Sequence, residues 1–149
     1  MKNKPYLTLG VLLGVHLLVM FALTYSGVNA LDDVFVNLNR FYMAVLMVAP
    51  MTILMVLAMW HMFENRRANI AIIAVATLVF VGAFAAIRSQ AMVGNEQFLR
   101  SMIPHHSIAI KTCNNADITD AETKQLCDEI VQAQREEIAQ MRDILERLG

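Results

Sequence analysis

Three long stretches without a charged side chain constrain this sequence more than any other feature. Residues 7–25, 41–62 and 68–87 contain no Lys, Arg, Asp or Glu. Each stretch is close to the ~20 residues that an α-helix needs to cross a hydrocarbon layer of ~30 Å. Irregular backbone would leave its polar groups unpaired in lipid. We therefore predict three transmembrane helices in a lipid bilayer, over residues 7–25, 41–62 and 68–87.

The first stretch could instead be a signal peptide. Lys2 and Lys4 precede it, and Val28-Asn29-Ala30 resembles a cleavage site. Its apolar run, however, is longer than the 7–15 residues of a signal-peptide core. We therefore interpret it as a membrane span.

Charge is concentrated in the last third of the chain. Charged residues make up 17% of the sequence, against roughly 25% in an ordinary soluble domain. Before Arg88, five Lys/Arg against three Asp/Glu give +2, and from Arg88 onward seven against ten give −3. Hydrophobic residues make up 57% of the sequence, which excludes a disordered chain, and the net charge of −1 excludes a basic protein with nucleic acid as its partner. We predict a membrane domain over residues 1–90 and a hydrophilic domain over residues 91–149.

The basic residues of the front half indicate an orientation. Lys2, Lys4, Arg66 and Arg67 fall on one side of the predicted spans, and only Arg40 lies in the loop on the other side. Flanking Lys and Arg collect on the cytoplasmic side. We therefore expect a protein of the bacterial inner (cytoplasmic) membrane, with a cytoplasmic N-terminus and a periplasmic C-terminal domain.

The C-terminal domain has the pattern of two amphipathic helices. Apolar side chains recur at helical spacing over residues 95–115 and 120–148. The short connection favours antiparallel neighbours, and Thr119 with Glu122 fits a capping box at the start of the second helix. Two such helices bury little apolar surface alone. We predict an all-α fold whose C-terminal hairpin pairs with another copy in a homo-oligomer, or with a larger membrane complex.

Cys113 and Cys127 are the only cysteines, one on each arm of the predicted hairpin. Outside the cytoplasm, a matched pair in this position is typical of a disulfide that clamps the two arms. A pair of thiolate metal ligands and a pair of buried free thiols are the alternatives.

A methionine, a proline and two adjacent histidines carry the densest chemistry of the chain, in the segment 102–106. Pro104 cannot donate a backbone hydrogen bond, and its ring clashes with the carbonyl of Arg100. The resulting kink would let His105 and His106 approach one centre.

The second arm supplies complementary ligands. Antiparallel pairing of the arms brings Glu137 and Met141, one turn apart, near Met102 and the two histidines. Imidazole and thioether together suit copper, and methionine favours Cu(I), whereas calcium selects oxygen ligands. The alternative is that the methionines are core fillers. We predict a copper site made of Met102, His105, His106, Glu137 and Met141.

The same segments resemble a known family. Met102-Ile103-Pro104-His105-His106 with Ala109-Ile110, followed by Gln134-Arg135-Glu136-Glu137-Ile138-Ala139-Gln140-Met141, is similar to the domain-of-unknown-function 305 family. The resemblance covers about residues 94–149. It implies a fold related to the ferritin-like helical bundles, and copper binding in the bacterial periplasm. The two cysteines resemble those of a subgroup of the family.

A methionine ridge runs along the second predicted span. Met43, Met47, Met51, Met55 and Met59 recur every fourth residue, and His61 follows. At 3.6 residues per turn these positions form a slanted line on one helix. The ridge would serve as a path for Cu(I), or as a packing surface against neighbouring helices.

These features predict a membrane-anchored protein that binds or handles copper, with a non-catalytic structural or accessory subunit as the alternative. A ferritin-like di-iron enzyme needs Glu-x-x-His pairs, but Glu137 is followed three residues later by Gln140. Neither a Ser-His-Asp set nor a Gly-rich phosphate loop stands in the sequence. We therefore do not expect an enzyme.

Overall fold

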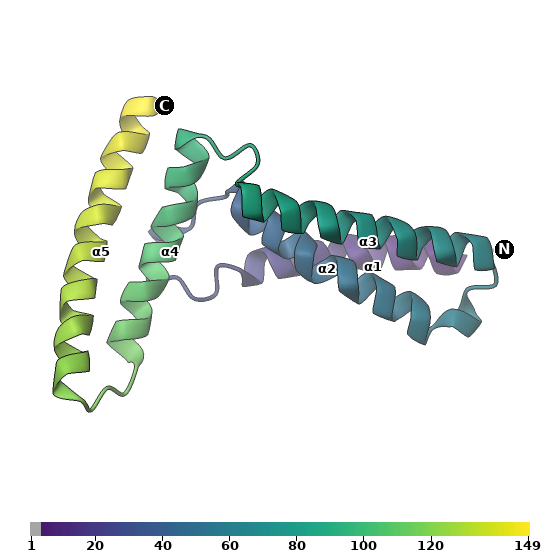
Figure 1. Cartoon of the computed structure of the whole chain (residues 1–149), viewed down its shortest axis with the longest axis horizontal. Helices are drawn as coiled ribbons and strands as arrows, with labels where there is room; N and C mark the ends of the chain where they lie inside the picture. The colour runs from purple at the N-terminus through teal and green to yellow at the C-terminus, as the bar shows by residue number, and fades with distance from the viewer. Residues whose placement is uncertain (1–3) are drawn as a thin grey trace. The chain divides into compact units, whose positions relative to one another are not determined.

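The computed structural model describes residues 4–149, and its regular elements there are all helical (Figure 1). The described elements are α1 (Lys4–Leu23), η1 (Leu31–Asp33), α2 (Leu38–Ala58), η2 (Trp60–Met62), α3 (Arg66–Ser89), α4 (Asn95–Asn115) and α5 (Ala121–Leu148). The prediction of an all-α fold is confirmed. Lys2, which contributed to the expected orientation, lies outside the described residues.

The chain forms two compact units, and the loop between α1 and α2 belongs to the second. The first unit contains α1, α2 and α3, up to Thr24 and again over Asn39–Ala91. The second contains Tyr25–Leu38 and Met92–Gly149. We call these the apolar-helix unit and the C-terminal unit, and we call residues 25–38 the strap. We did not predict from the sequence that the strap joins the C-terminal unit.

The three helices of the apolar-helix unit are long and apolar enough to cross a membrane. Their bounds agree with the predicted spans to within a few residues. The second differs most, since α2 ends at Ala58 and the 3-10 turn η2 follows. At its other end the Arg40 guanidinium donates to the carbonyl of Thr24, just beyond α1. A cation in this position complements the partial negative charge of a helix C-terminus.

Few residues of these helices are buried inside the structure. In the most apolar stretch of α1, α2 and α3, only 6%, 22% and 11% of the residues are buried. An apolar cavity of about 560 Å³ lies among the three helices. Thr52 lines it, but its hydroxyl donates to the carbonyl of Val48 at 2.9 Å and is therefore satisfied. Helices this apolar and this exposed suit a lipid bilayer.

The C-terminal unit is built on α4 and α5, which lie side by side (Figure 1). Leu99, Ile103 and Ile110 of α4 pack with Ile138 and Met141 of α5 to form its core. These positions are three, four or seven residues apart, which places them on one face of each helix. The two helices predicted from apolar spacing are thus present, with nearly the expected bounds.

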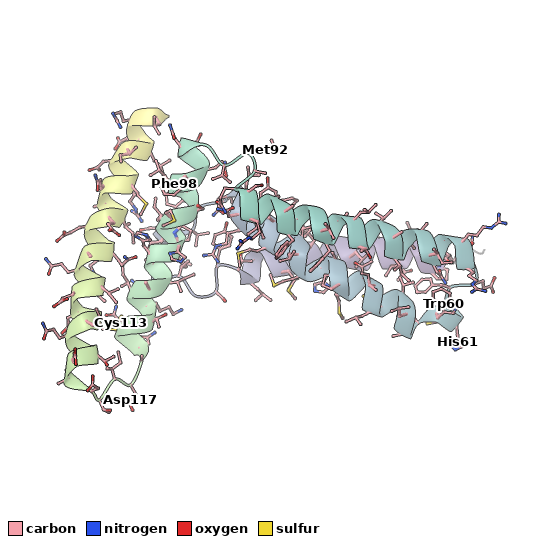
Figure 2. The ribbon with its side chains drawn as sticks, in the orientation of Figure 1. Trp60, His61, Met92, Phe98, Cys113 and Asp117 are labelled. Carbon is pink, nitrogen blue, oxygen red and sulfur yellow. A yellow bond between two sulfur atoms is a disulfide. The ribbon has the colours of Figure 1, made fainter. Side chains whose placement is uncertain are left out.

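A disulfide joins the two helices near their connecting turn. Cys113 and Cys127 are bonded, with Cα atoms 5.4 Å apart, and Figure 2 shows Cys113 close to the turn at Asp117. The predicted pairing is confirmed. The expected capping box is wrong by one residue, because Asp120 caps α5 and accepts a hydrogen bond from the Thr123 N–H at 2.7 Å.

Pro104 lies in the middle of α4 and is fully buried. Because proline has no N–H, the carbonyl of Arg100 cannot form its usual bond within the helix. The Nδ2 of Asn37 in the strap donates to this carbonyl at 3.2 Å. The same amide donates to the carbonyl of Phe35 at 2.8 Å, and Asn37 is only 3% exposed. The strap therefore supplies the donor that Pro104 removes.

We expect Asn37→Ala to lower the free energy of unfolding of the C-terminal unit by about 1 kcal/mol, because it leaves the partly buried carbonyl of Arg100 without its donor. Pro104→Ala restores an N–H to α4, so the same substitution should cost less in that background. Amide hydrogen exchange of α4 in the full chain measures both effects. Asn114→Ala, on the exposed side of α4, is the matched control. Equal costs in the two backgrounds would contradict this role of Asn37.

Candidate metal centre at the seam of α4 and α5

His106 and Glu137 meet across the seam between α4 and α5. The Nδ1 of His106 lies 3.0 Å from Oε2 of Glu137, with side-chain exposures of 12% and 50%. The approach is not aligned for a hydrogen bond, so this buried nitrogen has no hydrogen-bond partner among the described residues. Gln134 donates from Nε2 to the same carboxylate oxygen at 3.2 Å. The seam thus holds a nitrogen donor and an oxygen donor that face each other.

Burial sets the charge state of His106. Loss of hydration lowers the pKa of its imidazole below the usual 6.5, the Glu137 carboxylate raises this pKa, and His105 lowers it again. The net shift is downward, which favours the neutral form of the imidazole. A metal ligand must be the neutral form of histidine. His106 is therefore ready to bind a cation without first losing a proton.

The two methionines of the predicted site belong to the core of the C-terminal unit or pack against it, and each stands one helical turn along the chain from His106 or Glu137. Met141 is 8% exposed and belongs to the core of the C-terminal unit, and Met102 packs against that core. Both therefore have the partial or full burial of ordinary core residues. Each also carries a thioether, a soft donor: Met102 precedes His106 by four residues, and Met141 follows Glu137 by four residues.

His105 differs from its neighbour, because its side chain is exposed. The centres of the two imidazole rings are 5.9 Å apart and the rings are inclined by 59°. A metal bound at about 2.0 Å from a ring nitrogen lies about 3 Å from the ring centre. An ion bound by both rings would therefore have to lie almost on the line between the two ring centres, and the structure brings only His106 to Glu137 in the seam.

The donors fit a metal only if methionine takes part. Two ligands bonded at about 2.0–2.2 Å to one ion stand about 3 Å apart, which is the separation of His106 Nδ1 and Glu137 Oε2. Within residues 4–149, however, there is no group of three or more His, Cys, Asp or Glu side chains that could hold an ion. A complete site at this seam therefore needs ligands of another kind, and the thioethers of Met102 and Met141 are of the kind that selects a soft cation.

The methionine ridge of α2 does not have a single environment. Met43, Met47 and Met51 are 42–44% exposed on the apolar-helix unit. Met55 and Met59 instead pack against a cluster formed by Leu9, Val56 and Phe63. Because α2 ends at Ala58, Met59 lies outside the helix, and the predicted line of five methionines on one helix is wrong at its last residue. His61 lies in η2 and is exposed; Figure 2 shows it beside Trp60. The ridge is thus divided between an outward face and a packed face.

Sequence patterns did not identify the residues that support the seam. Asp33 is 7% exposed, accepts from the Ser107 hydroxyl at 2.5 Å and pairs with Arg142 at 2.6 Å. Ser107 and Arg142 directly follow His106 and Met141 in the chain. The one available signal was Asp33 itself, a charged residue in a loop between two apolar stretches.

Comparisons with known proteins agree with the resemblance seen in the sequence. The family described as "Domain of unknown function (DUF305)" matches residues 83–145. The chain is also 36% identical over 122 residues to an uncharacterized protein of Acanthamoeba polyphaga mimivirus, which covers 79% of this chain and 77% of that protein. No solved structure matches the chain.

The lowered pKa of His106 predicts how stability depends on pH. Between 6.5 and the lower folded-state pKa, the unfolded chain binds more protons than the folded chain, so the free energy of unfolding should decrease as the pH falls through this range. Histidine NMR titration of the full chain measures the pKa directly. Glu137→Gln should lower it further, because the carboxylate favours the charged imidazole. A His106 pKa at or above 6.5 would contradict this description of the seam.

Proposed function

We propose the following function for this chain, which belongs to the family of the domain of unknown function (DUF305). The protein is a membrane-anchored, non-catalytic copper-binding protein whose site lies at the seam of α4 and α5. Its ligands are His106, Glu137, Met102 and Met141, with His105 approaching from the exposed side. Three apolar helices hold this site at a bilayer.

The buried nitrogen of His106 is the observation that carries the proposal. A buried polar atom is normally hydrogen-bonded, and one left without a partner calls for an explanation. Here Nδ1 lies 3.0 Å from a carboxylate oxygen without hydrogen-bond alignment. A cation held between the two atoms would satisfy both of them.

The two methionine ligands are the reason that we propose copper as the cation. Cu(I) accepts imidazole and thioether ligands, whereas calcium and magnesium select oxygen. Each methionine stands four residues from a harder donor, so one turn of each helix offers one soft and one harder ligand. When bound, copper would contribute its affinity for sulfur and its one-electron chemistry. The residues of this chain bind and orient it.

We also propose the cellular compartment of each part of the chain. The C-terminal unit lies in the periplasm of a bacterium, and the N-terminus lies in the cytoplasm, at the inner membrane. The Lys/Arg distribution of the sequence supports this orientation. The disulfide between Cys113 and Cys127 also supports it, because such bonds persist in oxidising compartments.

The exposed apolar side chains of the C-terminal unit support a second candidate function, assembly. Phe98, Leu126 and Leu148 are 51%, 55% and 49% exposed. Two hairpins packed on such side chains would form a four-helix arrangement like the ferritin-like bundles. In this alternative the protein is an accessory subunit that oligomerises through its helices, and the histidines have no metal.

We expect the purified full chain to bind one Cu(I) per copy, in preference to calcium or magnesium. His105→Ala combined with His106→Ala should abolish binding and leave helix content intact, because alanine is the better helix former. Met102→Leu should weaken Cu(I) binding selectively, since the exchange nearly conserves volume. Competition with a Cu(I) chelator of known affinity measures each effect.

His61→Ala is the matched control, because it removes an exposed histidine from the apolar-helix unit and should leave the stoichiometry unchanged. Full copper stoichiometry in the double histidine variant would refute the proposed site. A wild-type chain that binds no copper but forms a stable oligomer would support the accessory subunit instead.

A further inference from the structure

The strap follows α4 over much of its length. The Lys111 ammonium donates to the carbonyl of Ser26 at 3.3 Å, and the N–H of Leu38 donates to Oε1 of Gln97 at 2.9 Å. The start of the strap thus contacts the end of α4 and the end of the strap contacts its start, so the two segments are antiparallel. Between them, Gly27 lies so close that a Cβ there would meet Cγ1 of Ile108 at 3.3 Å. The strap is thus packed on the helix that carries His106.

One buried carboxylate joins the strap to both helices. Oδ2 of Asp33 accepts from the Ser107 hydroxyl at 2.5 Å, and Oδ1 lies 2.6 Å from Nη2 of Arg142 on α5. The Ser107 oxygen in turn accepts from the N–H of Asn29 at 2.8 Å, and Arg142 also donates to the carbonyl of Asp32 at 3.1 Å. A buried charge is tolerated when it is paired and hydrogen-bonded, and removing a partner is costly. These bonds therefore fix the strap, α4 and α5 together at one point.

The attachment points adjoin the proposed ligands. Ser107 is the residue after His106, and Arg142 is the residue after Met141. Because successive residues on a helix differ by about 100° in direction, fixing one side chain fixes the direction of its neighbour. Ser107 is fully buried, so α4 cannot rotate there without breaking the bond to Asp33.

We propose that Asp33 is a positioning residue for the copper site: by holding Ser107 and Arg142 it sets the rotation and separation of the two helices that supply the ligands. This inference rests on the proposed function. It also makes the strap part of the metal-binding unit, although the family match over residues 83–145 does not include it. Residues of two distant segments then act on one site.

The test compares Asp33→Asn with Asp32→Asn in the full chain. Asp33→Asn keeps the shape of the side chain but removes the charge that pairs with Arg142, whereas Asp32 is exposed and is the matched control. We expect Asp33→Asn to weaken Cu(I) binding about tenfold, within the range found for residues that support metal ligands. Ser107→Ala, which keeps the Asp33–Arg142 pair, should have a smaller effect in the same direction.

Two further measurements separate positioning from general destabilisation. In the metal-free chain, amide hydrogen exchange should increase for Asp33→Asn in the strap and around Ser107, but not for Asp32→Asn. With one Cu(I) bound per copy, the copper K-edge X-ray absorption spectrum of Asp33→Asn should differ from that of wild type, because the ligands meet the ion with a changed geometry. A merely unstable variant would load less copper and give the wild-type spectrum.

The outcomes distinguish this inference from the proposed function. If the wild-type chain binds no copper, the proposed function fails and the inference fails with it. If wild type binds copper and Asp33→Asn matches it in affinity and spectrum, only the positioning role of Asp33 is overturned. Weaker binding with an unchanged spectrum also overturns that role.

Discussion

The C-terminal unit depends on the hydrogen bond from Asn37 to the carbonyl of Arg100. Pro104 removes one donor from the interior of α4, and leaving the partly buried carbonyl of Arg100 without a partner would cost free energy. The replacement donor comes from a loop 63 residues earlier in the chain. The strap is therefore required by the helix that carries the two histidines.

The remaining contacts of the C-terminal unit are consistent with this constraint. With the strap on α4, Asp33 reaches both Ser107 and Arg142, and Phe35 packs against the core formed by α4 and α5. Far along the two helices, the disulfide between Cys113 and Cys127 holds them together near the turn. The seam is thus fixed from the strap side and at one end, which leaves His106 and Glu137 facing each other between helices of defined rotation.

Features that depend on local periodicity or composition could be predicted from the sequence. Uncharged runs located α1, α2 and α3, apolar spacing located α4 and α5, and the lone cysteine pair indicated the disulfide. The family resemblance was carried by the segments around His106 and Glu137. Each of these signals lies within one stretch of chain, where the helical repeat or the hydrocarbon thickness of a bilayer fixes the pattern.

Contacts between distant polar side chains could not be predicted in the same way. The pairing of Asp33 with Arg142 spans 109 residues, and nothing periodic marks either partner. The different exposures of His105 and His106 depend on the rotation of α4, which the strap helps to fix. Pro104 was the available clue, since its missing N–H required an outside donor, but the sequence did not indicate that Asn37 would supply it.

Copper K-edge X-ray absorption of the Cu(I)-loaded full chain tests most directly whether the seam is a mixed thioether and imidazole site. We expect both sulfur and nitrogen or oxygen neighbours around the ion. Met102→Leu or Met141→Leu should reduce the sulfur contribution, and His106→Ala should reduce the nitrogen contribution. A coordination shell without sulfur, or one that these substitutions leave unchanged, would contradict such a site.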